Sequence, residues 1–172
     1  MAGTLTVQNL QGPSSGANAN KVIIPSGQTL DASNGFVAPA GSVVQTIRMT
    51  PTSTAFSTAS TSYLKTNLAL SITPKYANSL IKIEMSCTLL NQGDELDLRL
   101  YRNGVDIALQ TQIHGDYDGS GTYTTTALMY TDLPNTTSST EYALYAKVLA
   151  GSNGGTGYVY REQHMLLQEI AQ

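Results

Sequence analysis

After Gly41 the chain is a series of short segments in which every second residue is apolar, and this period of two is typical of β-strands. The clearest example is the segment 80–89, in which Ile81, Ile83 and Met85 alternate with charged or hydroxyl side chains. No window has apolar residues at the spacing of an amphipathic helix. The pattern therefore predicts an all-β fold for this part of the chain.

The segment around residue 100 predicts a β-hairpin. In residues 96–101, three leucines alternate with charged or tyrosine side chains, so the leucines are expected to face the core. Asn103-Gly104 follows, and both residues tolerate the positive φ angles that a two-residue hairpin turn requires. Val105 and every second residue after it are then expected to resume the buried row.

Two further stretches complete the predicted set of strands. TYTTTALMYTDLP predicts a strand that ends before Pro134, and residues 140–172 predict a final pair of strands joined by the hairpin loop GSNGGTG. About eight strands with short turns and no crossover helix predict an antiparallel β-sandwich, with a jelly roll preferred. We assign this sandwich to residues 42–172.

Residues 1–41 have a different pattern and are expected to form an extended N-terminal arm. KVIIPSGQTLDASNG begins like a strand, but Pro25 and Gly27 break it, and too little apolar surface follows to form a sheet. The surface that buries this arm is therefore expected outside the chain, on other copies of the same chain, and an arm that orders only on docking is the alternative. The residues expected to make its contacts are Val22, Ile23, Ile24, Leu30, Phe36 and Val37.

The composition narrows the possible partners. Only 12% of the residues are charged, about half the usual fraction. The net charge of −3 comes without a basic cluster, which argues against a nucleic-acid partner. No apolar stretch approaches the roughly 20 residues that span a bilayer, so no membrane partner is expected. The single cysteine, Cys87, is expected to be a small buried hydrophobe.

Several motifs resemble catalytic or ligand-binding sites, and each has a simpler interpretation. GSNGGTG leads into a strand and not into a helix, so it is not expected to bind phosphate. DYDGSG, residues 116–121, resembles the start of a calcium loop without the later acidic ligand, which leaves an ion or an acidic turn as alternatives. His114 and His164 have no partner at ligand spacing, and the charges around Asp97 are expected on a solvated strand face. We expect no catalytic residue and no cofactor.

Tyrosine is the unusual element of the composition, with ten Tyr against two Phe and no Trp. Exposed tyrosines are rigid and amphipathic, which suits a contact surface. The alternative is that about half of them pack in the core with the hydroxyl at the rim. The candidates for surface recognition are Tyr117, Tyr123, Tyr158 and Tyr160.

AGSVVQTIRMTPTSTAFSTASTSYLKTNLALSITPKYANSLIKIEMS resembles a segment of tailed-phage virion proteins of the cyanophage type. In these proteins a GSVVQ-like strand, a Ser/Thr-rich stretch, an SITP strand end, an LYRNG-type hairpin and a closing strand such as MLLQEIAQ follow one another. The opening MAGTLTVQNLQGPSSG is also similar to their leader. The resemblance covers almost the whole chain, and its motifs are structural.

The resemblance implies a non-enzymatic protein of the virion surface. Because such proteins are commonly trimers, we expect a homotrimer with the closing strand or the strand 80–89 near the three-fold axis. Two roles remain open. A capsid decoration or cement protein would bind the major capsid protein or another virion protein through residues 1–41, whereas a short tail fibre would recognise a host surface glycan.

Overall fold

A computed structural model describes residues 11–19, 21–29, 38–50, 54–92, 96–113, 122–149 and 155–172. The chain divides into two compact units, residues 1–37 and residues 38–172. In the first unit the described residues form turns, with no helix or strand among them. The side chains of Val22, Ile23 and Ile24 are 50%, 55% and 42% exposed. The apolar run of the arm is therefore open to solvent.

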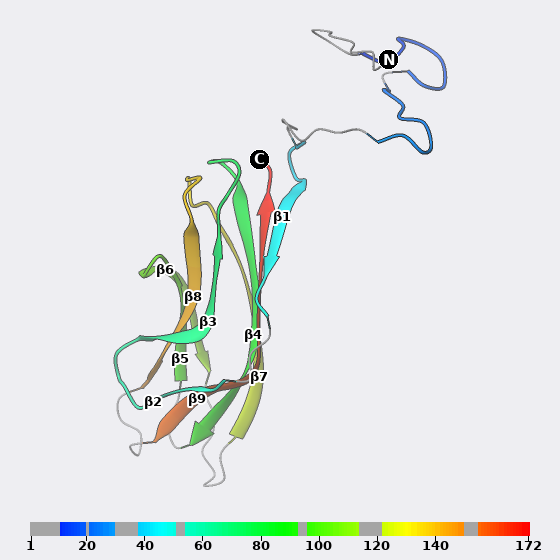
Figure 1. Ribbon diagram of the computed structural model, residues 1–172. Helices are drawn as coiled ribbons and strands as arrows, with labels where there is room; N and C mark the ends of the chain where they lie inside the picture. The colour runs from blue at the N-terminus through cyan, green and yellow to red at the C-terminus, as the bar shows by residue number, and fades with distance from the viewer. Residues whose placement is uncertain are drawn as a thin grey trace, which may run out of the picture. The chain divides into compact units, whose positions relative to one another are not determined.

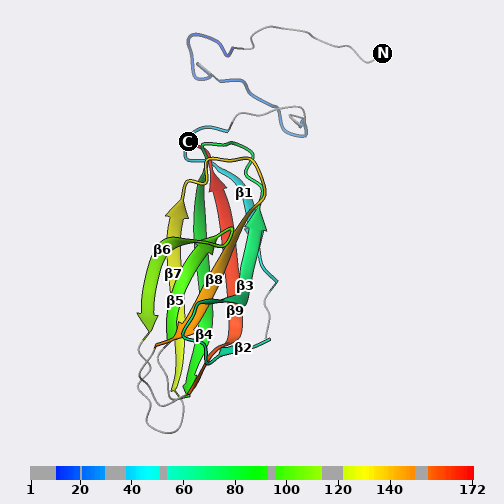
Figure 2. The same cartoon turned by 90° about the vertical axis from the view of Figure 1, so that its left-hand side faces the viewer.

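Residues 38–172 form a sandwich of two antiparallel β-sheets, which confirms the predicted fold class (Figure 1). The described strands are β1 (Val43–Arg48), β2 (Phe56–Thr58), β3 (Leu64–Ile72), β4 (Leu80–Gln92), β5 (Leu96–Arg102), β6 (Val105–Ile113), β7 (Thr122–Asp132), β8 (Thr140–Val148) and β9 (Thr156–Ile170). One sheet has the order β1-β9-β4-β7, with the short β2 also paired to β9. The other has the order β3-β8-β5-β6, and Figure 2 shows it facing the viewer.

The core lies between the two sheets and is formed by the inward-facing row of each strand. In β4, Ile81, Ile83 and Met85 are at most 4% exposed, which confirms the alternation expected there. The three leucines of β5 are at most 1% exposed and belong to the same apolar cluster. Each large side chain buried in this way stabilises the fold by roughly 1.5–3 kcal/mol.

Consecutive strands do not always pair, and this corrects one prediction. β8 and β9 lie in different sheets, so the prediction that these two strands form a hairpin joined by GSNGGTG is wrong. The reason is that alternation of apolar and polar residues identifies a strand but does not show which other strand pairs with it. The jelly-roll prediction remains an interpretation. The strand order agrees with a jelly roll because the first and last strands, β1 and β9, pair with each other.

The β5–β6 hairpin confirms the predicted turn. Asn103 and Gly104 have φ angles of 49° and 79°, as expected when two residues connect paired strands. The expectation that Val105 is buried is wrong, because its side chain is 63% exposed. The pairing register shifts between Arg99 and Tyr101, so the alternation does not continue unbroken through the turn.

A buried carboxylate fixes the turn between β3 and β4. Glu169 is 0% exposed, and its Oε2 accepts a hydrogen bond from Gln45 Nε2 at 2.6 Å. Its Oε1 accepts hydrogen bonds from the backbone N–H groups of Lys75 and Tyr76, at 2.8 and 3.0 Å, and from Ser79 Oγ at 2.7 Å. Burial alone raises the pKa of Glu169, but these hydrogen bonds outweigh burial and hold the pKa below its usual value.

The chain enters the sandwich at one end of the β1-β9-β4-β7 sheet. The N–H of Gly41 donates a hydrogen bond to the carbonyl of Ala171 at 2.8 Å, and the N–H of Ala171 donates one to Ser42 at 2.9 Å. The C-terminus therefore lies beside the start of β1, as Figure 1 shows. The first residues of β9 lie at the opposite end of the sheet, roughly 40 Å away at the usual rise of a strand.

Candidate interaction surfaces

Three of the four tyrosines expected at the surface gather at that opposite end of the sheet. In the sheet register, Leu90 of β4 lies between Tyr123 of β7 and Tyr158 of β9. The ring of Tyr123 is 61% exposed, and its centroid is 5.8 Å from that of Tyr160. We call the region formed by Tyr123, Tyr158 and Tyr160 the tyrosine end. Tyr117 lies outside the described residues, as do Leu30, Phe36 and Val37 of the arm.

The outer face of the other sheet carries an aromatic cluster that the sequence analysis missed. The rings of Tyr101 in β5 and Tyr145 in β8 are stacked with their centroids 3.9 Å apart, and the ring of Tyr63 lies 6.2 Å from that of Tyr101. Three separate parts of the chain supply these rings. Alternation places Tyr101 on the outer face of its strand, but nothing local in the sequence shows that β5 and β8 are neighbours.

Asp97 lies under this cluster, so the expectation of a solvated face is wrong. The residue is 2% exposed, and its Oδ2 accepts a hydrogen bond from the Tyr63 hydroxyl at 2.5 Å. Burial and this hydrogen bond raise the pKa of Tyr63. Arg99 and Lys147 lie 4.9 and 4.8 Å from the centre of the Tyr63 ring, within the range of cation–π contacts. Tyr63 reaches over β5 from the segment before β3, and this is why the carboxylate is covered.

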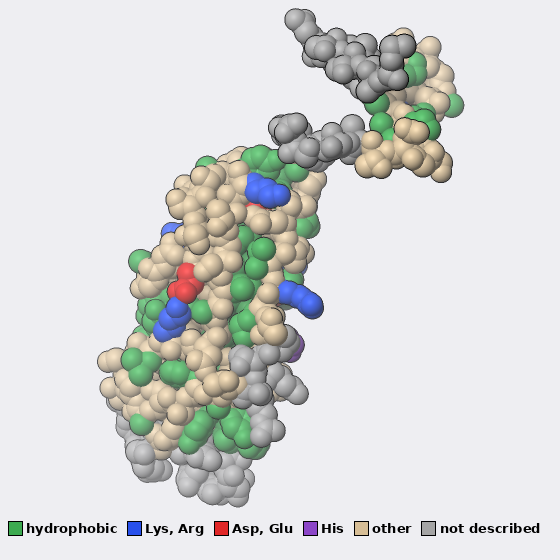
Figure 3. Space-filling model, viewed as in Figure 1, with side chains coloured by type: hydrophobic (Ala, Val, Ile, Leu, Met, Phe, Trp, Pro, Cys, Tyr) green, Lys and Arg blue, Asp and Glu red, His purple; other side chains and the backbone are tan. Residues whose placement is uncertain are grey.

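Charged side chains are sparse on the surface that Figure 3 shows, where single Lys or Arg and Asp or Glu groups stand among uncharged ones. This agrees with the charged fraction of 12%. A partner of such a surface would be held mainly by apolar contacts and neutral hydrogen bonds, since exposed ion pairs add about 0–1 kcal/mol each.

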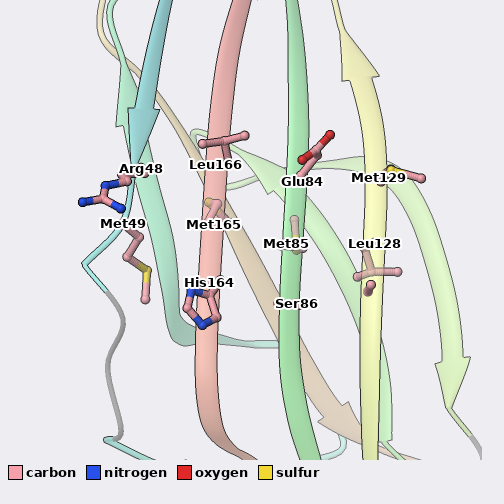
Figure 4. Close-up of a pocket in the computed structure, with 11 residues that line it drawn as sticks. Arg48, Met49, Glu84, Met85, Ser86, Leu128, Met129, His164, Met165 and Leu166 are labelled. Carbon is pink, nitrogen blue, oxygen red and sulfur yellow. The ribbon is translucent and has the colours of Figure 1, made fainter.

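A groove of about 440 Å³ opens on the outer face of the β1-β9-β4-β7 sheet (Figure 4). It is lined by Arg48, Met49, Glu84, Met85, Ser86, Ala127, Leu128, Met129, His164, Met165 and Leu166. Four of the five methionines of the chain are among these residues. Figure 4 shows Arg48 on the β1 side of the groove and Met129 on the β7 side, with Leu166 and Glu84 between them. Sequence reasoning did not find this groove, because four strands supply its lining.

The described residues contain no group of three or more His, Cys, Asp or Glu side chains that could hold a metal ion. DYDGSG and His114 lie outside the described residues, so the alternative of an ion there stays open. The described part of the chain also has no helix with the length and apolar character needed to cross a membrane.

No protein-family model and no curated protein matches this sequence. Solved structures similar to the chain include dimeric latent PorU from Porphyromonas gingivalis, which is 8% identical with a TM-score of 0.37 and is matched over 78% of this chain and 14% of PorU. The structure of the Gx strain of infectious bursal disease virus is 14% identical with a TM-score of 0.35, over 86% of this chain and 40% of that chain. The chain thus spans less than half the length of either protein. Likeness at this level carries no functional argument.

Proposed function

We propose that this chain is a non-enzymatic structural protein of the bacteriophage virion surface, acting as a homotrimeric capsid decoration or cement protein. The observation that carries the proposal is the apolar run Val22, Ile23 and Ile24, whose side chains are 42–55% exposed. The described core of the sandwich is complete without residues of the arm. The run therefore needs a surface outside the chain, and the sequence resemblance favours a virion protein as that surface.

The sandwich itself suits display on an anchor. The chain enters it at one end, beside Ala171. The tyrosine end lies at the opposite end of the same sheet, roughly 40 Å away. A protein held through the segment before Ala38 would keep that end free for contacts.

In this proposal the protein acts by burying surface, with no chemical step. Residues 1–41 contain Lys21 and Asp31 as their only charged side chains, so anchoring rests on apolar and backbone contacts. Exposed ion pairs are worth about 0–1 kcal/mol each, and salt screens them further. Attachment to particles should therefore survive moderate salt.

The test is attachment of the full-length protein to particles that lack it. Ile23→Asp combined with Ile24→Asp should abolish co-sedimentation with the particles, because burying unpaired charges is costly. Val105→Asp is the matched control, since Val105 is 63% exposed on the sandwich. Release of the wild-type protein by salt, together with retention of the double variant, would show an electrostatic anchor and contradict the proposal.

Recognition of a host surface glycan is the second candidate, and the tyrosine end favours it. Tyr123 is 61% exposed, and its ring is 5.8 Å from that of Tyr160, which suits stacking against sugar rings. Tyr123→Ala and Tyr160→Ala should each weaken binding to purified host surface polysaccharide by roughly two- to tenfold. Val105→Ala should leave it unchanged. Absence of polysaccharide binding by the wild-type protein would remove this candidate.

A further inference from the structure

The two outer faces of the sandwich differ in how many of their charged and aromatic side chains are paired with one another. The β3-β8-β5-β6 face is closed by its own contacts, which include the stacked tyrosines and the Lys65–Glu141 ion pair at 2.7 Å. On the β1-β9-β4-β7 face the one described ion pair is Lys82–Glu84 at 2.5 Å. Next to this pair lies the groove.

Apolar side chains line two sides of the groove, on β7 and on β9. Met129 is 74% exposed, the highest value among the described large apolar side chains. Leu166 is half-buried across the groove, and Ser86 and Ala127 are small enough to leave the space between them open. Methionine adapts its shape to a partner surface and is common at binding sites. The groove therefore has the character of a contact surface between proteins.

The strand beside the groove lacks the usual protection of a sheet edge. β7 has 11 residues and is an end strand of its sheet, and it pairs with β4 without a register shift. It contains no Lys and no Pro, and its one charged residue, Asp132, is bound by Arg102 at 2.8 Å and by the hydroxyl of Tyr142 at 2.7 Å. Edge strands of natural proteins normally carry charges, prolines or bulges that prevent pairing with another chain. β7 carries none of these on its open side, as expected for an edge that a partner covers.

The charges around the groove indicate a second copy of the chain as that partner. Arg48, on the β1 side, is exposed and has no acidic partner among the described residues. Glu84, toward the β7 side, is the described carboxylate of the groove, and its one partner among the described charged residues is Lys82. A neighbouring copy turned so that its β4 side meets the β1 side of the first would bring Glu84 toward Arg48. Arg48 on one side of the groove is thus opposite in charge to Glu84 on the other.

We propose that copies of this chain associate through the outer face of the β1-β9-β4-β7 sheet, with the groove and β7 buried against a neighbouring copy. This inference rests on the proposed self-assembly of the protein and names the surface that carries it. The groove lies over β4 and β9, the strands that the sequence analysis expects near the symmetry axis. Arg48 and Glu84 orient the copies, and Met129 and Leu166 supply the apolar contact.

The first test is the mass of the full-length protein in solution at neutral pH and micromolar concentration. Native mass spectrometry or light scattering should give a multiple of 18.3 kDa for the wild-type protein. Met129→Glu should weaken association by roughly tenfold or more, because it places a charge in an apolar contact. Val105→Glu, on the opposite sheet, should associate as the wild type does. Circular dichroism confirms that each variant keeps its β-sheet signal.

A second test uses charge reversal at exposed positions, where folding is not at risk. Arg48→Glu alone should weaken association, and mixing it with Glu84→Arg copies should restore part of it. A monomeric wild-type protein would overturn both this inference and the proposed trimer while leaving the anchor test untouched. An oligomer that resists both Met129→Glu and Arg48→Glu, or one that Val105→Glu dissolves equally, would overturn the groove as the interface and leave self-assembly standing.

Discussion

At the scale of single residues, Glu169 shows how a charged group can occupy the inward-facing row of a strand. Its neighbours in that row, Leu167 and Ala171, are 0% and 4% exposed, and Glu169 itself is 0% exposed. Burying a carboxylate is costly unless donors surround it. Here Ser79 and Gln45 reach its two oxygens from different parts of the chain. The charge therefore acts as a structural link between the β3–β4 turn and the last strand.

Stability should depend on the ionisation of Glu169. Because hydrogen bonding lowers its pKa in the folded state below the usual value of about 4.3, the carboxylate adds its full stabilisation above that pH. The stabilisation is lost as the pH falls through the lowered pKa of the folded protein. Glu169→Gln should reduce the free energy of unfolding at pH 7 by about 1–3 kcal/mol and should weaken its acid dependence. Urea unfolding at neutral and acidic pH measures both effects.

The matched control for this prediction is Glu84→Gln. Glu84 is half-exposed, and its ion pair in the described part of the chain is with Lys82, so its replacement should change the free energy of unfolding by at most about 1 kcal/mol. Equal effects of the two substitutions would contradict the structural role of Glu169.

Cys87 should be chemically inert in the folded protein. The residue is 2% exposed in β4, and burial raises the pKa of its thiol to about 12. The reactive thiolate is then scarce at pH 8. A thiol-specific reagent should label the native protein very slowly and the urea-unfolded protein completely. Rapid labelling of the native protein would show that β4 opens or that the thiol is accessible.

At the scale of the elements, the two sheets meet closely near the start of β9. Gly157 pairs with Thr58 of β2 and Asn91 of β4. It also faces Leu96 of β5 in the opposite sheet, where a Cβ on Gly157 would lie 2.4 Å from Leu96 Cδ2. Leu96 is 1% exposed and is held by the core. The absence of a side chain at Gly157 is thus what allows the sheets to pack here.

Gly157→Ala should therefore lower the free energy of unfolding by about 1–3 kcal/mol through overpacking. In a double-mutant cycle with Leu96→Ala the cost of the added methyl group should shrink, because the smaller side chain leaves room for it. Urea denaturation of the four proteins measures the coupling. Additive effects would mean that the two residues are not in contact.

At the scale of the whole molecule, the sandwich and the arm have different sources of stability. Every described strand and the described core lie in residues 38–172. The arm exposes its apolar run. The sandwich should consequently fold by itself, whereas the apolar side chains of the arm should become buried only when the arm binds a partner.

Deleting residues 1–37 should leave the β-sheet circular dichroism signal intact and shift the melting temperature little. Deleting residues 1–42 should lower the melting temperature further, because it also removes the backbone hydrogen bonds that join Gly41 and Ser42 to Ala171. Thermal melts of the two truncated proteins and the full chain make the comparison. Loss of the β signal in the shorter deletion would show that the arm is part of the folding unit.

Local patterns in the sequence determined much of the fold. Alternation identified the buried sides of β4 and β5, and Asn103-Gly104 identified the hairpin turn, because side-chain direction and turn conformation depend on residues close together in the chain. The burial of Cys87 followed from the same alternation. The exposed tyrosine Tyr123 was also named from the sequence, since a solvent-facing position in a strand is a local property.

The tertiary structure alone decided which strands are neighbours, and the candidate surfaces depend on that. Asp97 is buried because Tyr63 reaches over it from another part of the chain. β8 and β9 do not form a hairpin, because β9 pairs with β1 and β4 in the other sheet. The groove joins side chains of four strands that are far apart in the sequence. A period of two specifies the side of a strand on which a residue lies, but strand order follows from the packing of the two sheets as a whole.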